Sequence, residues 1–421
     1  MSLAAFLASL AAAGLLLTTV QVFLVWRARR PFARRPAAAS PPGASSPRTA
    51  RRVSILKPLS GLDDGLEENL ASFARLTGVE HEVILSAERG DDPAVDAARA
   101  VMARLPDAPF RLVVGGAARR PLENGKVDRL VAAARHATGD VLLVSDSNVR
   151  VAPGDVAATA ALFDDPSVGC VSNLFVAQGA ETFGARVEAL HLLSFVVPGA
   201  ALAAAGGFPC VVGKSMAVSR RALEAIGGFG AFLGVLAEDQ AIGLAVRAAG
   251  FRVVLSGVVV RNVVERRTLA RALDRQVRWG KIRYAFSRTA YTAELLLNPF
   301  PLALLAAAAA LLLSPDLLQG CGALAGAVGL ARVAQASVLA RATGSDLPAP
   351  SFAAVLVKDV LQLATHLVPY VSDEVAWHGL RARVGPGTAL LPAGRHVPSL
   401  EMAPEGPLAP LTPPPAAPSP A

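Results

Sequence analysis

The sequence is poor in cysteine and in aromatic residues. Its three cysteines, Cys170, Cys210 and Cys321, are odd in number and lack CxxC spacing. They predict neither a disulfide framework nor a thiolate metal site, and a reducing compartment is expected. Phe, Trp and Tyr make up 5% of the residues and are not interleaved with the bases. The net charge of +8 therefore does not indicate a nucleic-acid partner.

Charged residues are also scarce, and one stretch near the N-terminus has none. Residues 3–26 are uncharged, which is long enough to cross a bilayer. A cleavable signal peptide is the alternative, but its basic residues would precede the apolar run, and this run is too long. We therefore predict a retained transmembrane anchor over residues 1–27.

Three more apolar blocks lie toward the C-terminus, and we predict that residues 291–372 form two or three transmembrane or membrane-associated helices. The last block is the weakest as a span, because it contains a lysine, an aspartate and a histidine. A buried or re-entrant helix fits it almost as well. The blocks are 295–313, interrupted by Pro299 and Pro301, 317–340 and 352–371.

Positive charge flanks the region between these apolar segments. Five arginines lie in residues 27–35, and residues 278–288 contain four further bases. By the positive-inside rule, both flanks place residues 52–290 in the cytoplasm and residues 1–2 on the opposite face. The chain is thus expected to be a multi-pass membrane protein, of the inner membrane in a bacterium. Residues 28–51 are a basic, Pro/Ala-rich linker, and residues 373–421 end in a Pro/Ala-rich tail.

Short apolar strands alternate with amphipathic helices between residues 52 and 290. This alternation predicts βαβ units and a parallel sheet covered on both faces. In such sheets ligands bind at the carboxyl ends of the strands. The expected strands are 52–58, 81–87, 110–114, 140–146 and 168–172, and the expected helices include 65–76 and 93–105.

Aspartates follow several of these segments. Asp91 and Asp92 follow the second strand and precede a proline, so helix capping is their simplest role. Asp239 opens an apolar helix, where a favourable charge at the helix N-terminus is the alternative to catalysis. Asp146 ends the fourth strand two residues before Asn148; this pair can hold a divalent cation against a diphosphate, although turns often contain the same residues.

An R-x-x-R-W pattern, Arg275, Arg278 and Trp279, stands shortly before the second apolar block. A membrane-flanking anchor is one explanation, since Trp lies at headgroup level and bases mark the cytoplasmic side. The segment 187–210 is also apolar and lies between two motifs; an interfacial helix or hairpin and a buried core helix are both compatible with it.

Taken together, seven segments resemble the inverting nucleotide-sugar glycosyltransferases of the GT-A fold. Within that group the chain is most similar to ceramide glucosyltransferases and their bacterial relatives, including hopanoid-biosynthesis-associated glycosyltransferases. The resemblance covers about 52–290 and implies a Rossmann-like nucleotide-sugar-binding α/β domain. The segments on which this resemblance rests are 53–73, 90–96, 124–130, 145–151, 213–229, 237–243 and 275–281.

The resemblance assigns roles residue by residue. Asp239 is implied as the catalytic base, with Arg275, Arg278 and Trp279 as further catalytic residues, and Asp146 as the ligand of Mg²⁺ or Mn²⁺. Two residues depart from the pattern: Asn148 stands where many sugar transferases carry a second acid, and Asp128 where an Asn is frequent. The residues implied to bind the nucleotide sugar are Lys57, Pro58, Asp91, Asp92, Lys126 and Asp146.

The implied reaction moves a hexose, with glucose expected, from a UDP-sugar to a lipid hydroxyl, with ceramide first among acceptors. A single displacement inverts the anomeric centre and forms a β-glycoside. The alternative acceptor is a hopanoid or another lipid, with a sugar such as N-acetylglucosamine. A non-catalytic membrane scaffold would instead predict broken motifs, and the three aspartate motifs and the R-x-x-R-W element are intact.

Overall fold

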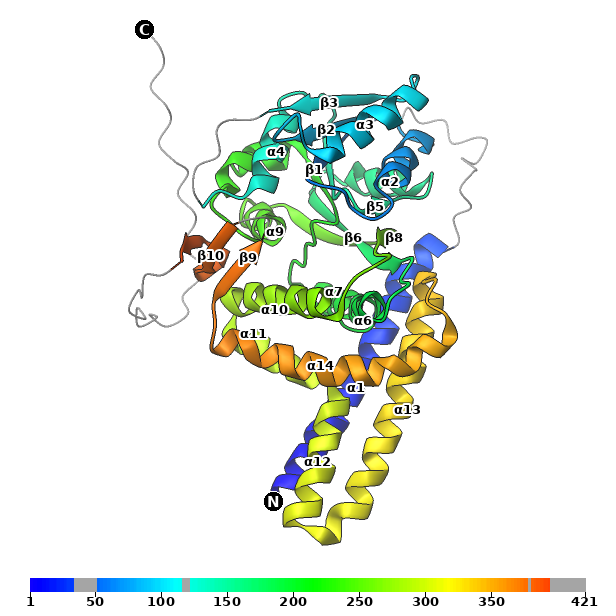
Figure 1. The fold of residues 1–421 in the computed structure, drawn as a ribbon, viewed down its shortest axis with the longest axis vertical. Coiled ribbons are helices and arrows are strands. Elements are labelled where there is room, and N and C mark those ends of the chain that lie inside the picture. The colour runs from blue at the N-terminus through cyan, green and yellow to red at the C-terminus, as the bar shows by residue number, and fades with distance from the viewer. Residues whose placement is uncertain (34–50, 116–121, 378–379, 394–421) are drawn as a thin grey trace.

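The computed structural model describes residues 1–33, 51–115, 122–377 and 380–393. An α/β domain forms one end of the molecule, and a bundle of long apolar helices extends from it (Figure 1). The predicted combination of an α/β domain with one N-terminal and several C-terminal apolar helices is confirmed.

The domain is built on one eight-stranded sheet, in the order β3-β2-β1-β4-β7-β6-β8-β5. The first four predicted strands are present and pair in parallel, and the fifth is longer than expected. Strand β1 is buried along its whole length. These strands are β1 (Val53–Leu59), β2 (His81–Ala87), β3 (Phe110–Val114), β4 (Val141–Ser145) and β6 (Val168–Gln178).

In the other half, β6 and β8 (Arg252–Val263) also pair in parallel, but the expectation of an all-parallel sheet is wrong for two strands. Strand β7 (Ser215–Ser219) runs antiparallel to both β4 and β6, and β5 (Val149–Arg150) runs antiparallel to β8. The segment between β6 and β7 contains helices that lie beneath the sheet, and the chain then returns to it as an antiparallel neighbour of β6 (Figure 1).

Helices cover both faces of this sheet, as predicted. Alternate residues of β1 point to opposite sides, so that Ile55 belongs to one hydrophobic cluster and Leu56 to the other. Asp92 caps α3 and Pro93 occupies its first turn, while Asn124 caps α4. The covering helices are α2 (Leu66–Ser72), α3 (Pro93–Arg104), α4 (Gly125–Ala134), α5 (Asp155–Ala160), α8 (Arg220–Ala225) and α9 (Glu238–Ala248).

Three long helices form the apolar bundle: α1 (Leu3–Ala33), α12 (Pro299–Leu313) and α13 (Leu318–Thr343). With 31 residues, α1 is about 46 Å long, enough to cross a bilayer. Small residues let the helices approach closely, as in the cluster of Ala4, Ala306 and Cys321. This cluster places the N-terminus beside the α12–α13 turn, at the end of the bundle far from the α/β domain (Figure 1).

Other helices lie across the near end of the bundle, beneath the sheet (Figure 1). The segment from α6 through α7 is mostly buried in the main hydrophobic core, as the buried-helix alternative expected. Helix α14, the weakest predicted span, contacts α10, α12 and α13. These helices are α6 (Phe183–His191), α7 (Val197–Ala205), α10 (Leu269–Phe286), α11 (Arg288–Ala293) and α14 (Val355–Leu367).

A buried ion pair joins α13 to α14. The Arg332 Nε lies 2.9 Å from the Asp359 Oδ2, and Lys358 also pairs with Asp359. All three side chains are almost completely buried. Charges in such a place need partners, and here both cations share the one carboxylate of Asp359.

Replacing Asp359 by Asn is therefore expected to destabilise the bundle. The isosteric change leaves Arg332 and Lys358 without their shared carboxylate, and removing one partner of a buried pair typically costs about 3–5 kcal/mol. Thermal unfolding in detergent should show a lower midpoint. The control is Asp316→Asn at the exposed α12–α13 turn, where the midpoint should not move. Equal midpoints for the two variants would contradict a stabilising role for Asp359.

The C-terminal segment contains a three-stranded antiparallel sheet that we did not predict: β9 (Glu374–Trp377), β10 (Leu380–Val384) and β11 (Leu390–Pro392). It supports the loop leading into α9, because the Leu236 N–H donates to the Thr388 carbonyl oxygen at 2.9 Å and the Leu390 N–H to that of Gly234 at 2.8 Å. The Pro/Ala-rich tail from residue 404 lies outside the described residues.

Candidate active site

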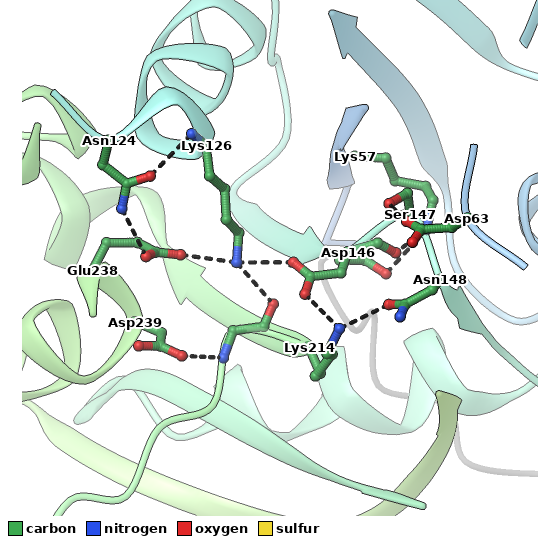
Figure 2. A network of polar contacts seen from close by, with 12 residues as sticks. Lys57, Asp63, Asn124, Lys126, Asp146, Ser147, Asn148, Lys214, Glu238 and Asp239 are labelled. Atoms are coloured by element: carbon green, nitrogen blue, oxygen red, sulfur yellow. Dashed lines mark hydrogen bonds and ion pairs between the residues drawn. The ribbon is translucent and has the colours of Figure 1, made fainter. Parts of the chain in front are cut away.

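A buried network of acids and lysines lies where β4 ends and where α4 and α9 begin (Figure 2). The Lys126 Nζ lies 2.8 Å from the Asp146 Oδ1 and 2.8 Å from the Glu238 Oε1. The Lys214 Nζ lies 2.9 Å from the Asp146 Oδ2 and 2.8 Å from the Asn148 Oδ1. Three segments that are distant in sequence therefore meet around the Asp146 carboxylate.

The charge of Asp146 is maintained by these lysines. Burial alone would raise the pKa of Asp146, but the ammonium groups of Lys126 and Lys214 outweigh burial and hold it well below its ordinary range. Burial would likewise lower the pKa of Lys126, yet Asp146, Glu238 and Asp239 raise it above its ordinary value. Both groups therefore stay ionised at neutral pH.

Lys57 lies beneath this network and is completely buried. Its Nζ donates to the Asp146 carbonyl oxygen at 2.9 Å and to the Ser145 Oγ at 3.2 Å, and it lies 4.1 Å from the centre of the Phe73 ring. Burial lowers the pKa of Lys57 to about 7. Lys57 thus fixes the end of β4, and the adjacent Pro58 is a buried residue of β1.

Asp239, the implied base, opens α9. Its Oδ2 accepts the Gly213 N–H at 2.6 Å and its Oδ1 the Gln240 N–H at 2.8 Å. Burial and the neighbouring Glu238 raise the pKa of Asp239 to about 6. A carboxylate with a pKa near neutrality is suited to accept a proton from an alcohol.

Asp91 and Asp92 are not part of the network. Asp91 is exposed and pairs with Arg89, whose Nε lies 2.8 Å from its Oδ1. Asp92 caps α3 by accepting the Ala94 N–H at 2.9 Å, as the capping alternative expected, and it also accepts the Gly61 N–H at 2.9 Å. A direct contact of either residue with the nucleotide sugar stays a prediction.

The R-x-x-R-W residues lie on α10 in a second cluster beneath the sheet. The Arg275 Nη1 lies 2.5 Å from the Glu188 Oε1, and its guanidinium stacks 4.6 Å from the Trp279 ring centre. Burial, together with Arg275 and another arginine, lowers the pKa of Arg278 to about 10. Trp279 is half-buried against the main core, which argues against a purely membrane-anchoring role.

The two clusters are electrostatically linked. Burial lowers the pKa of Lys214, the Asp146 carboxylate raises it, and Arg275 lowers it further. The pKa therefore lies below its ordinary value. The hydrogen bond and ion pair of Arg275 go to Glu188, outside the Asp146 network. The implied catalytic role of Arg275, Arg278 and Trp279 therefore stays a prediction.

Sequence reasoning missed four residues that shape these clusters. Lys214 and Glu238 belong to recognised segments, but neither received a role. The Asn124 Nδ2 donates to the Glu238 Oε2 at 3.2 Å, and the segment "NGK" in the sequence could have pointed to this residue. Glu188 pairs with both Arg267 and Arg275, and its place as a single acid in an apolar run could have indicated a buried ion pair.

The network does not fit a divalent ion as it is arranged. Both oxygens of Asp146 face lysines, and the Asn148 amide oxygen accepts from Lys214. In the described part of the chain no group of three or more His, Cys, Asp or Glu side chains is placed to hold a metal. An ion at Asp146 would have to displace a lysine. The reaction is therefore derived from the side chains alone.

One mixed sheet carries the acidic and basic site, and four helices of the described chain are long and apolar enough to cross a membrane. The profile of Glycosyl transferase family 21 matches residues 6–390, and the chain belongs to this family. The predicted resemblance to the ceramide glucosyltransferase group is thereby confirmed.

Two curated relatives are from Caenorhabditis elegans. Ceramide glucosyltransferase 3 is 28% identical over 259 residues, which cover 61% of this chain and 55% of that protein. Ceramide glucosyltransferase 1 is 26% identical over 240 residues, covering 55% and 50%. The chain therefore spans about half the length of the curated relatives it matches.

Solved structures show more distant similarity. A mannosyltransferase from Pyrobaculum calidifontis, in complex with GDP-Man and Mn²⁺, is 22% identical with a TM-score of 0.45, covering 86% of this chain and 99% of that one. Glucosyl-3-phosphoglycerate synthase from Mycobacterium tuberculosis, in complex with Mn²⁺, UDP-glucose and phosphoglyceric acid, is 18% identical with a TM-score of 0.36, covering 53% and 75%.

Proposed function

We propose that the protein transfers a hexose, with glucose expected, from a UDP-sugar to a lipid hydroxyl, with ceramide as the first acceptor to test. The observation that carries this proposal is the position of Asp239, a carboxylate with a pKa of about 6 beside a cluster of buried lysines. A base next to fixed positive charge is what an alcohol and a departing diphosphate require.

The reaction is a single displacement at the anomeric carbon. The acceptor oxygen attacks, Asp239 takes its proton, and the bond to the diphosphate oxygen breaks. Fixed ammonium groups near Asp146 stabilise the charge that develops on the leaving diphosphate. Because one displacement inverts the carbon, an α-linked donor gives a β-glycoside.

The membrane helices provide the route for a lipid acceptor. The bundle presents exposed apolar side chains such as Phe23, Leu312 and Leu330, and the helices beneath the sheet join it to the α/β domain (Figure 1). A lipid whose hydroxyl lies at headgroup level would therefore enter from the side of the domain that faces the bilayer.

The function is tested by incubating membranes that contain the protein with radiolabelled UDP-sugars and identifying labelled lipids by mass spectrometry. A hexosylceramide formed from UDP-glucose supports the proposal. A labelled hopanoid, or labelling only from UDP-N-acetylglucosamine, would favour the alternative acceptor or sugar. Membranes without the protein are the control, and no labelled lipid from any donor would contradict the transferase function.

The proposed topology places the α/β domain in the cytoplasm. Arg27, Arg29 and Arg30 end α1, and Arg341 ends α13, both at the domain end of the bundle. The Arg29 Nη1 also donates to the Gly257 carbonyl oxygen at 2.7 Å, which ties α1 to the sheet. At the opposite end, residues 314–317 of the α12–α13 turn contain no lysine or arginine. This asymmetry agrees with the positive-inside rule.

Cysteine labelling measures this topology. In a Cys210→Ala background expressed in bacteria, Asp316→Cys should react with an impermeant maleimide on intact spheroplasts. Asp107→Cys, at an exposed site of the α/β domain, should react only after permeabilisation. The two variants make the same substitution, so they control for each other. Labelling of Asp107→Cys from outside would contradict the cytoplasmic placement, because UDP-sugars are supplied in the cytoplasm.

A further inference from the structure

Lys214 occupies the place between two side chains where a divalent ion was predicted. Its Nζ lies 2.9 Å from the Asp146 Oδ2 and 2.8 Å from the Asn148 Oδ1, so one ammonium bridges the ends of the Asp-x-Asn segment (Figure 2). The lysine is buried, with 8% of its surface exposed. A fixed cation is thus already coordinated by the residues that would hold a metal.

The charges of this segment match an ammonium better than a divalent ion. Two carboxylates would balance an ion of charge +2, but here the second position is the neutral Asn148. The two ammonium groups of Lys126 and Lys214 are balanced by the two carboxylates of Asp146 and Glu238. A buried site tolerates excess charge poorly, so the replacement of an acid by an amide and the presence of the lysine are consistent with each other.

Lys214 is also better placed to contact a ligand than the other two lysines. The Lys126 ammonium has three acceptors, in Asp146, Glu238 and the Gly213 carbonyl oxygen, which match its three N–H groups. Lys57 is completely buried. Among the described residues Lys214 has two hydrogen-bond acceptors, so a third N–H can donate to a phosphate oxygen.

We propose that Lys214 takes the role of a divalent metal ion in this chain, and that the donor diphosphate is bound without one. Asp146 and Asn148 orient the ammonium, and its remaining N–H donates to a diphosphate oxygen, where it stabilises the charge of the leaving group. This inference rests on the proposed function, because it names how that site holds its nucleotide.

The first test needs no variant. Binding of UDP to the purified full-length protein is measured by titration calorimetry with EDTA and with Mn²⁺, and Mn²⁺ binding is measured separately by electron paramagnetic resonance. We expect UDP affinity to differ less than twofold between the two conditions. UDP binding that is lost in EDTA and restored by Mn²⁺ would overturn the proposal.

The second test removes the lysine and then restores a second acid in its place. Lys214→Met should weaken UDP binding about tenfold or more, since a charge-assisted hydrogen bond is lost. The double variant Lys214→Met with Asn148→Asp restores a second acid, and its UDP binding should recover with Mn²⁺ and fall again with EDTA. Arg221→Met, an exposed base-to-Met change on α8, is the control expected to behave as wild type.

The outcomes separate this proposal from the proposed function. A wild-type protein that binds UDP in EDTA but labels no lipid would support the lysine site and contradict the transferase function. A wild-type protein that labels lipids only with added Mn²⁺ would support the transferase function and overturn the lysine site. Lys214→Met with unchanged UDP affinity would also overturn it.

Discussion

Replacing Asp239 by Asn is expected to lower kcat by about 10³-fold while UDP affinity stays near that of the wild type. The amide keeps the shape of the side chain and can still accept the Gly213 N–H, but it cannot take a proton from the acceptor alcohol. Initial rates with a labelled UDP-sugar give kcat, and calorimetry gives the affinity. An exposed carboxylate on α8, changed in Glu224→Gln, is the control.

The pH profile gives this prediction an independent signature. The base must be deprotonated, and the pKa of Asp239 is raised to about 6. The wild-type rate should therefore rise as the pH increases through about 6 and level off above it. The residual rate of Asp239→Asn should lack this rise. A variant that retains both a normal kcat and the rise would assign the base to another residue.

The adjacent acid should behave differently. Glu238 is buried and pairs with Lys126 at 2.8 Å, so Glu238→Gln is expected to disturb the lysine network and raise KM more than it lowers kcat. This contrast between neighbours distinguishes a proton acceptor from a positioning residue. Equal losses in kcat for both variants would remove the distinction.

Replacing Asp146 by Asn is expected to lower kcat/KM by about 10²-fold or more. The change removes the carboxylate shared by Lys126 and Lys214, and each lost charge-assisted hydrogen bond is worth about 1.5–3 kcal/mol. The lysines then lose their fixed positions, and UDP binding weakens with them. Steady-state kinetics and calorimetry measure the two effects.

The matched control lies at the other end of the same strand. Asp140 is exposed just before β4, and Asp140→Asn should leave kcat/KM unchanged. A thermal unfolding midpoint for Asp146→Asn close to that of the wild type would show that the loss comes from the site and not from the fold. If Asp146→Asn keeps wild-type kcat/KM, the proposed diphosphate site is contradicted.

Local patterns in the sequence were sufficient for much of this architecture. The apolar runs of β1 and β2 predicted buried strands, and Asp92 followed by Pro93 predicted the start of α3. The uncharged run near the N-terminus predicted α1. Each of these features depends on residues that are close in sequence, so periodicity and capping rules apply directly.

Strand direction and the small C-terminal sheet were decided by distant pairing. Strand β7 has no local feature that distinguishes an antiparallel from a parallel neighbour; its direction is seen only in its pairing with β4 and β6 in the folded sheet. Strands β9 to β11 are three to five residues long, and they become a sheet by packing around Leu236, in the loop before α9.

The site, too, was predicted in part from local sequence and in part decided only by the tertiary structure. The sequence by itself identified Asp146 and Asp239 as candidates, because they stand at a strand end and a helix start, and the family resemblance added Lys126. Only the tertiary structure showed that Lys214 meets Asn148, 66 residues earlier in the chain, and that Glu188 meets Arg275, 87 residues later. Local sequence does not specify which acid a given base will meet, because an ion pair forms wherever the folded chain brings the two charges within reach.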